Sequence, residues 1–363
     1  MIKFLIFFIF ISLAYIGLHL YIAKFFIKAG YLKNIANKFF LIIALVSISV
    51  LFLRRKLTGD IFEFFYFISF LWMGYVLIFS FFIFLENIFS LFIDFKKSFL
   101  IINILTLIVF FISIYNAFKV PKLNEINYFS DKVYNDYKIA FVSDLHLDFS
   151  FKRILFSRII DKILNQDPQI LIIGGDFLDP GFKIDKNVNK LRELKIPVLF
   201  VLGNHEYYYG IDKTFEVVNK LNFILLKDSS FKYEDLNLIG VSDIRTENLK
   251  LEEVREIISK NYDNKKFNIL VSHQPLYFKE LSKDFDFLML SGHTHCGQIF
   301  PFHIFTRIAY KYFCGEYKEN KSFLYVSKGA GSWGPFMRFL SNNEIVILNI
   351  KKYEKNNSKH SRY

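Results

Sequence analysis

Imidazole, carboxylate and amide side chains follow five short apolar runs between residues 137 and 295. One Asp-x-His or one Gly-Asp after such a run is weak evidence for a site, because these residues also form ordinary turns. Five of them in order, each after an apolar run, favour one shared metal site instead. The residues are Asp144, His146, Asp176, Asn204, His205, Glu206, His273, His293 and His295.

The number and type of these side chains predict two metal ions. A mixed set of oxygen and imidazole ligands suits Mn, Fe or Zn and does not suit calcium. The set is too large for one ion. Two divalent ions about 3.5–4 Å apart, sharing a bridging carboxylate and hydroxide, would use all of it and clamp both oxygens of an in-line displacement at phosphorus. The predicted reaction is therefore hydrolysis of a phosphate ester or anhydride.

The apolar runs that precede these residues predict the strands of an α/β domain with layered sheets, because amphipathic helical stretches alternate with them. Ligand sites in such folds collect beyond the carboxyl ends of the strands. Lys152, Arg153 and Lys162 are expected on the outer face of the first helix. The expected strands are 137–143, 169–174, 197–202, 236–241, 268–272, 286–290 and 323–327, and the expected helices are 151–165 and 249–260.

In this order the motifs resemble those of the calcineurin-like metallophosphoesterases, and in particular a small bacterial membrane-associated subgroup. The resemblance covers roughly residues 137–350 and implies the four-layer α-β-β-α sandwich of that family. The motifs that carry it are Asp144-x-His146, Gly175-Asp176, Gly203-Asn204-His205-Glu206, His273 and Gly292-His293-x-His295.

The resemblance also implies a role for each matching residue. Asp144, His146 and His295 would hold the first ion, with Asp176 as the bridge. The second ion would be held by Asn204, His273 and His293. His205 would contact the phosphate and protonate the leaving oxygen, a task that suits imidazole near neutral pH. The attacking hydroxide would come from metal-bound water.

The chain departs from the family pattern at Cys296, where the subgroup usually has glycine, and at Glu206, where the family most often has Asp. Cys296 is interpreted as an inert small substitute, with binding to soft metals as the alternative. The Gly-rich stretch 328–338 also resembles the subgroup. Its Arg338 is expected at a phosphate or at the surface, unless the stretch is an ordinary loop. Residues 207–209, all tyrosine, could stack on a base, line an acyl groove or simply pack.

Four apolar stretches, 3–23, 39–53, 66–85 and 99–118, predict a bundle of about four membrane helices. The expected organisation is a transmembrane anchor over 1–120, a metallophosphoesterase domain over 121–350 and a basic tail over 351–363. Lys and Arg number 11 against 4 acidic residues in the anchor, 30 against 29 in the domain, and 5 against 1 in the tail. The nearly neutral domain disfavours a nuclease, so no nucleic-acid partner is expected.

The charge count does not decide on which side of the membrane the domain lies, because the two sides carry six Lys and Arg residues each. An even number of spans puts the domain on the side of Met1. Two cysteines, Cys296 and Cys314, are expected as free thiols, with one disulfide as the alternative, and free thiols favour a reducing compartment. A bacterial inner membrane with the domain on the cytoplasmic side is therefore the expected location.

A membrane anchor adds nothing to hydrolysis, so it favours a phosphorylated or lipid-linked small molecule as the substrate. Related membrane-associated members of the superfamily cleave the pyrophosphate of UDP-2,3-diacylglucosamine in lipid A synthesis, which makes this nucleotide lipid the specific candidate and manganese the metal to test. The alternatives are a phosphodiesterase or phosphatase for a soluble nucleotide or phosphoprotein, and a non-catalytic scaffold.

Overall fold

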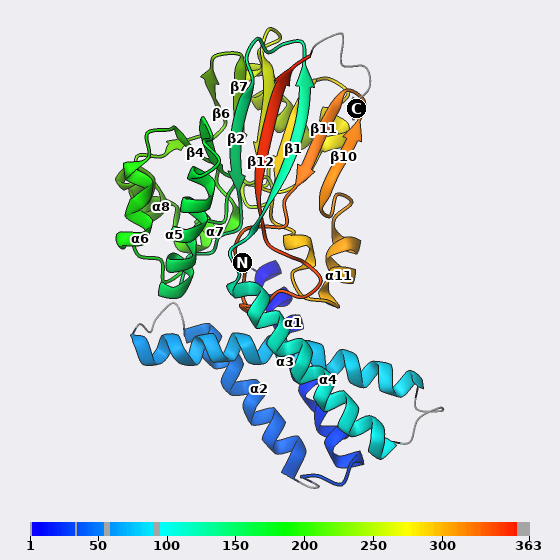
Figure 1. Ribbon diagram of the computed structural model, residues 1–363. Helices are drawn as coiled ribbons and strands as arrows, with labels where there is room; N and C mark the ends of the chain where they lie inside the picture. Colours follow the sequence, from blue (N-terminus) through cyan, green and yellow to red (C-terminus); the bar gives the residue numbers. More distant parts are fainter. Residues whose placement is uncertain (1, 33–34, 54–58, 90–94, 354–363) are drawn as a thin grey trace. The chain divides into compact units, whose positions relative to one another are not determined.

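The computed structural model describes residues 2–32, 35–53, 59–89 and 95–353 (Figure 1). The chain divides into two compact units, which are described separately. A helical unit comprises Met1–Lys119, Gln298–Phe305 and Gly334–Leu340, and a catalytic unit comprises the remaining segments. The predicted division at residue 121 stays a prediction. Residues 354–363 of the predicted basic tail lie outside the described residues, as do Lys33, Arg54, Arg55 and Lys56 of the charge count.

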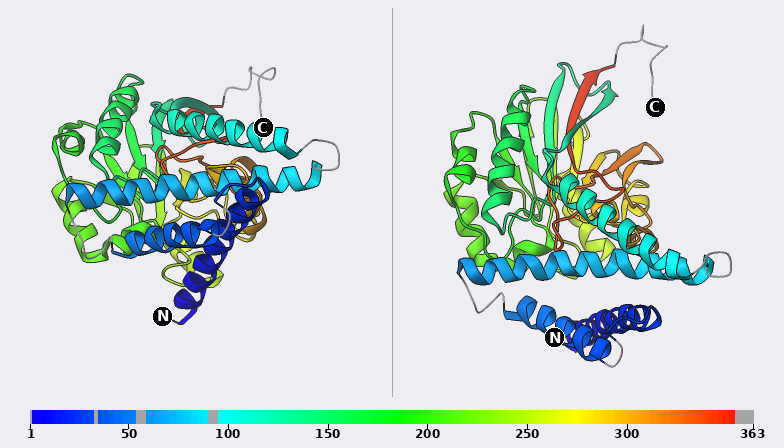
Figure 2. Two further views of the ribbon diagram at one scale, coloured as in Figure 1. Left: turned by 90° about the horizontal axis from the view of Figure 1, so that it is seen from below. Right: turned by 60° about the horizontal axis from the view of Figure 1, so that its bottom comes forward.

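Four long helices make up most of the helical unit: α1 (Ile2–Lys28), α2 (Ala36–Leu53), α3 (Asp60–Phe89) and α4 (Phe95–Phe118). All four contain a stretch long and apolar enough to cross a membrane, which confirms the four predicted segments. The helix α3 runs without interruption in both views of Figure 2. Large apolar side chains such as Phe111 and Tyr115 remain exposed, as expected for helices that are apolar on all sides.

Two short segments from the second half of the chain pack with α3 and α4. Ile299 and Met337 form an apolar cluster with Ile78 of α3, and the Phe300 ring meets Phe81 edge-on at 5.0 Å. On α4, Ser113 O accepts a hydrogen bond of 2.7 Å from Arg338 N. Residues 298–305 and 334–340 are thus part of the helical unit although they are distant from it in sequence.

The catalytic unit contains two six-stranded sheets. The first sheet has the order β1-β12-β2-β3-β4-β5. Its last-synthesised strand, β12, lies between β1, to which it is parallel, and β2, to which it is antiparallel. The strands are β1 (Lys122–Ser130), β2 (Tyr137–Val142), β3 (Ile170–Ile173), β4 (Val198–Phe200), β5 (Ile224–Leu225) and β12 (Glu344–Lys352).

The second sheet has the order β10-β11-β9-β8-β7-β6. One apolar cluster contains Phe141 and Ile172 from the first sheet and Leu238 and Leu290 from the second, so the two sheets face each other across a common core. All seven predicted strands are found within two residues of their expected positions. The strands are β6 (Ser229–Tyr233), β7 (Leu236–Val241), β8 (Phe267–Ser272), β9 (Leu288–Ser291), β10 (Gly315–Glu319) and β11 (Ser322–Val326).

Helices cover the outer faces of the two sheets, which confirms the predicted α/β sandwich. On the second sheet, Val254 and Ile258 of α9 (Leu251–Asn261) and Phe278 of α10 (Phe278–Leu281) share a core with strand residues such as Leu270. The helices α5 (Ser150–Leu164), α6 (Lys186–Asn189) and α8 (Ile211–Lys220) lie together on the side of β4 (Figure 1).

The expectation for α5 was wrong at two residues. Lys152 and Arg153 are buried, whereas Ile154 is exposed. Lys152 Nζ donates to Ser332 O at 3.0 Å and pairs with Asp148, and Arg153 Nε pairs with Asp185 at 2.9 Å. Hydrogen bonds and ion pairs with specific polar partners therefore allow these two charged side chains to be buried, although the amphipathic pattern of the helix puts them on its outer face.

Candidate metal centre

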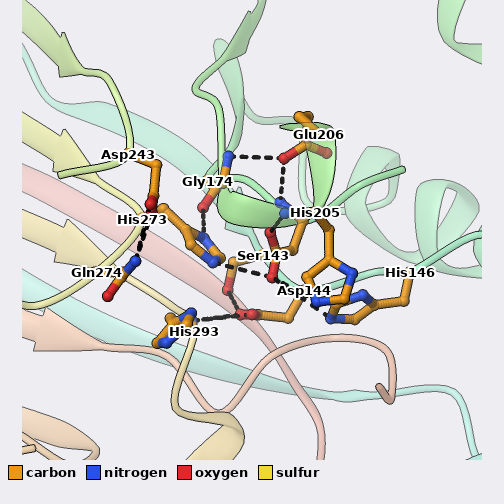
Figure 3. Close-up of polar contacts among 12 residues, drawn as sticks. Ser143, Asp144, His146, Gly174, His205, Glu206, Asp243, His273, Gln274 and His293 are labelled. Carbon is orange, nitrogen blue, oxygen red and sulfur yellow. Dashed lines mark hydrogen bonds and ion pairs between the residues drawn. The ribbon is translucent and has the colours of Figure 1, made fainter. Parts of the chain in front are cut away.

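The predicted site residues lie at the carboxyl ends of neighbouring strands. Asp144 and His146 follow β2, and Asp176 follows β3. The strands β2 and β3 are parallel neighbours in the first sheet, so their carboxyl ends lie side by side. In the second sheet His273 follows β8, and His293 and His295 follow β9. Asn204 and His205 begin the short helix α7 (Asn204–Tyr209) after β4. Figure 3 shows the side chains of Asp144, His146, His205, His273 and His293 close to one another.

Asp176 is central to this arrangement. Its Oδ2 lies 3.1 Å from His273 Nε2, 3.9 Å from His146 Nε2 and 4.0 Å from His205 Nε2. Its other oxygen, Oδ1, accepts a hydrogen bond from His205 N. Burial raises the pKa of a carboxyl group, but the surrounding imidazoles outweigh burial and hold the pKa of Asp176 well below its usual range.

Three groups of side chains among the described residues have ligand atoms within 4.8 Å of one another, as a metal site requires, and the third of them is His146, Asp179 and His205. Asp144, His146 and His295 form the first group. His146 Nε2 and His295 Nε2 are 3.1 Å apart, and His295 Nε2 is 3.4 Å from Asp144 Oδ1. The second group is Asp176, His273 and His293. The family resemblance assigns the first group to one ion, and assigns His273 and His293 of the second group, together with Asn204, to the other, with Asp176 as the bridge.

Two buried polar atoms in the site lack a hydrogen bond to any described residue, which is the arrangement expected where a cation binds. His273 Nδ1 donates to Gly174 O at 2.8 Å (Figure 3), so Nε2 is the ring atom that faces Asp176 Oδ2, at 3.1 Å. That Nε2 lacks an aligned hydrogen bond, and Asn204 Oδ1 is buried without a partner among the described residues. Buried acceptors without donors are costly unless a cation satisfies them. The donor set therefore fits divalent metal ions.

The backbone is strained at the site. Asp144, His146, Asp176, His293 and His295 all have φ between 47° and 69°, in the left-handed region that non-glycine residues rarely adopt. Strain of this kind concentrates at functional sites, where the surrounding structure enforces it. Gly203 is required for close approach, because a Cβ there would lie 2.2 Å from Asp176 Oδ1.

Glu206, a departure from the family pattern, holds the turn that carries Asp176. It is fully buried. Its two carboxylate oxygens accept hydrogen bonds from the backbone N–H groups of Asp176, Phe177 and Leu178, and Oε2 also accepts one from Gly203 N. One side chain of α7 thus fixes both the β3 turn and its own helix entry.

Asp179 is a site residue that the sequence interpretation missed. Its Oδ2 lies 2.9 Å from His146 Nδ1, and its Oδ1 lies 2.5 Å from His205 Nδ1. Burial disfavours a charged imidazole, but the Asp179 and Asp176 carboxylates outweigh it and raise the pKa of His205 to about 9. The available signal was the spacing Gly-Asp-x-x-Asp after β3, which puts both carboxylates in one turn.

Two aromatic rings flank His205. The Tyr208 ring lies 5.0 Å from its imidazole and the Trp333 ring 5.9 Å, both edge-on, and both side chains are about half exposed. Of the neighbouring tyrosines, Tyr207 donates to Glu247 Oε1 at 2.5 Å, and Tyr209 packs on Phe182. Tyr208 and Trp333 are therefore the aromatic side chains beside the predicted general acid.

A hydrogen-bonded network of Tyr310 and Arg245 holds the ring of His293 in place. Its Nε2 lies 2.6 Å from the Tyr310 hydroxyl, which leaves Nδ1 as the atom available to an ion. Arg245 Nη1 donates to the same hydroxyl at 2.8 Å. Outer partners of this kind orient metal-binding imidazoles.

Two sequence expectations are corrected here. Cys296 and Cys314 form a disulfide, with Cα atoms 5.3 Å apart, and are not free thiols. Arg338 is fully buried, so the expected surface contact is wrong. The preceding glycines do lie close to the site, because Gly331 N donates to Asp144 O and a Cβ on Gly331 would lie 2.3 Å from Leu145 O.

Comparison with known proteins agrees with this geometry. Residues 137–297 match a family model described as calcineurin-like phosphoesterase. An uncharacterized metallophosphoesterase of Campylobacter jejuni is 34% identical, over 68% of this chain and 68% of its own length. One from Helicobacter pylori is 31% identical, over 65% of each chain.

A protein of Danio rerio described as a transmembrane protein with metallophosphoesterase domain is also similar. It is 28% identical, over 69% of this chain and 62% of its own length. The chain thus aligns with about two thirds of the length of these relatives. The similarity to a transmembrane protein agrees with the four apolar helices.

Proposed function

The chain belongs to the calcineurin-like metallophosphoesterase family, and from this premise we propose that it is a membrane-anchored hydrolase that cleaves a phosphodiester or pyrophosphate bond with two divalent metal ions. The observation that carries the proposal is the position of Asp176 Oδ2, which faces imidazoles contributed by both sheets. A carboxylate so placed suits a bridge between two ions.

We assign the two ions to the two side-chain groups. Asp144, His146 and His295 would hold the first ion, and Asp176 would be shared. The second ion would be held by His273, His293 and Asn204. The unsatisfied atoms His273 Nε2 and Asn204 Oδ1 support this assignment. When bound, the ions supply a water of lowered pKa and neutralise charge on the phosphate.

The proton for the leaving oxygen comes from His205 in this proposal. Asp179 holds His205 Nδ1, so the ring turns Nε2 toward Asp176 Oδ2, at 4.0 Å. Burial lowers the pKa of this imidazole, but the Asp179 and Asp176 carboxylates outweigh burial and favour the protonated form that a general acid requires. Asp179 also holds His146 Nδ1 and so orients a predicted ligand and the predicted acid together.

A lipid-linked substrate is favoured by the anchor and by the half-exposed rings of Tyr208 and Trp333 beside His205. UDP-2,3-diacylglucosamine is the specific candidate, with manganese as the first metal to test. The Cys296–Cys314 disulfide argues against it, because disulfides persist mainly outside the cytoplasm, where this nucleotide lipid is not made. A lipid phosphodiester or pyrophosphate on the oxidising side fits both observations.

The test uses the full chain in lipid nanodiscs, first stripped of metal with a chelator and then supplied with Mn²⁺. Hydrolysis of bis(p-nitrophenyl) phosphate that depends on added metal would support the proposal. Bound transition metal should be about two ions per chain by elemental analysis. A preparation that neither binds metal nor hydrolyses any phosphate ester would instead indicate the non-catalytic scaffold.

The substrate class is tested separately on the same preparation. UMP release from UDP-2,3-diacylglucosamine would establish the nucleotide lipid. Hydrolysis of the artificial diester without UMP release would remove that candidate and keep the class. Faster turnover of cyclic nucleotides or phosphopeptides than of lipid phosphodiesters would favour the soluble-substrate alternatives.

A further inference from the structure

The helix α11 (Phe302–Ala309) exposes its apolar side chains. In the sequence FHIFTRIA, Thr306 is the one buried residue, and all eight residues are described. Phe302, Ile304, Phe305 and Ile308 are exposed, with Ile308 at 79% and Phe305 at 59%. By contrast, α5 buries most of its large apolar residues. Ile304, Phe305 and Ile308 therefore form an exposed apolar surface of the kind that a partner covers.

The apolar residues of α11 form one continuous face. At 100° per residue, Ile304, Ile308, Phe305 and Phe302 lie within about half of the helix circumference. Arg307 and His303 lie on the other side of that arc, and Arg307 is exposed. A short helix with an apolar face edged by a cation is typical of segments that lie in the lipid headgroup region.

The course of the chain indicates which partner this is. The residues that lead into α11 belong to the helical unit, where Ile299 packs on Ile78 and Phe300 on Phe81. Both partners lie on α3, a helix long and apolar enough to cross a membrane. Because α11 continues directly from this segment, the bilayer is the apolar phase closest to it along the chain.

We propose that α11 is an interfacial membrane helix, whose Ile304, Phe305 and Ile308 insert into the acyl-chain boundary of the bilayer while Arg307 meets anionic headgroups. This contact is separate from the four apolar helices. It also does not depend on which phosphoester the chain hydrolyses.

One consequence concerns the catalytic unit and rests on the proposed function. Tyr310 follows directly after α11, and its hydroxyl lies 2.6 Å from Nε2 of His293, a predicted metal ligand. Ile308 of the inserted face thus lies two positions before Tyr310 in the sequence, and Tyr310 supports the predicted metal site. A phosphoester carried on a lipid would then be hydrolysed at the membrane surface.

The contact is tested by fluorescence in the full chain. Trp72 and Trp333 are the two tryptophans, and both are replaced by Phe. A single Trp is then introduced as Ile308→Trp, as Phe305→Trp, or as the control Ile154→Trp on α5, where Ile154 is 49% exposed. Each variant is placed in nanodiscs of phosphatidylcholine and phosphatidylglycerol brominated in the upper acyl chain, and monodispersity is checked first.

The two α11 positions should be quenched several-fold more strongly by the brominated lipid than the Ile154→Trp control. Equal quenching at all three positions would overturn the proposal. Blue-shifted emission at the α11 positions without quenching would also overturn it, because that result would mean that protein, such as a second copy of the chain, covers the face.

The consequence for catalysis is tested with Ile308→Ser and its control Ile154→Ser. Turnover of soluble bis(p-nitrophenyl) phosphate should be unchanged in both, whereas turnover of a fluorescent phosphodiester lipid in the same nanodiscs should fall several-fold only in Ile308→Ser. An equal rate on the lipid would overturn this consequence. If the parent chain is inactive on both substrates, the proposed function is contradicted. The lipid contact is then judged by the quenching experiment alone.

Discussion

Asp176 is the side chain whose loss should disturb the site most, because one of its oxygens faces three imidazoles from different loops. We predict that Asp176→Asn removes most of the activity and much of the bound metal, since an amide cannot bridge two cations as a carboxylate does. Elemental analysis and diester turnover of the same sample measure both effects. Full turnover in this variant would disprove the two-metal assignment.

His205 should behave differently from the ligands. His205→Ala is expected to retain its metal and lose about 10²- to 10⁴-fold in rate, the usual range for general acid catalysis. A substrate with a better leaving group should recover part of the loss, because it needs less protonation. Loss of the metal in His205→Ala would instead make this residue a ligand.

Asp179 is predicted to be a positioning residue. Asp179→Asn keeps the size of the side chain but weakens its hold on His146 Nδ1 and His205 Nδ1, so kcat should fall about 10- to 100-fold. Asp185→Asn is the control, because Asp185 pairs with Arg153 and caps α6. If both variants lose the same activity, a general loss of stability explains the effect. The leaving-group dependence of the rate should change only in Asp179→Asn.

At the scale of elements, the β3 turn depends on one glutamate from α7. Glu206→Gln should lower the free energy of unfolding by about 2 kcal/mol or more, because an amide nitrogen then faces buried N–H groups that have lost their acceptor. The matched control is Glu253→Gln on α9, an exposed helix start where Glu253 accepts from Lys250 N alone. Thermal unfolding measures both, and equal shifts would contradict the role assigned to Glu206.

Local patterns predicted the elements that local sequence determines. The runs that became β2, β3, β8 and β9 are buried and strongly apolar, and the predicted site residues follow the ends of these strands. The interpretation missed β1, β5, β6, β10 and β12. The polar strands β6 and β10 have partly exposed residues and weak patterns. Strand β1 is stabilised by pairing with β12, more than 200 residues away, which no local pattern reveals.

The site shows the same limit. Residues that follow apolar runs directly were found, whereas Asp179 lies three residues beyond Asp176 and could be recognised only from its contacts with two histidines. Cys296 and Cys314 are 18 residues apart, and their pairing depends on how the intervening segment folds back. Arg338 was expected at the surface because the sequence around it does not reveal the packing that buries it.

At the scale of the whole molecule, the disulfide bears on the side of the membrane. We predict that Cys296 and Cys314 resist a maleimide reagent in freshly isolated membranes and react after reduction, because disulfides persist in oxidising compartments. A reporter fused to the C-terminus should then indicate an extracytoplasmic domain. Free thiols together with a cytoplasmic reporter would restore the expectation made from the sequence and the nucleotide-lipid candidate.

The place of β12 between β1 and β2 determines when the catalytic unit can be completed. Until residues 344–352 leave the ribosome, β1 has no neighbour in its sheet and β2 lacks one of its two. The anchor helices are synthesised first, so the chain should be inserted in the membrane with an open sheet edge that requires protection from aggregation. The first sheet therefore cannot close until β12 has been synthesised and has inserted between β1 and β2.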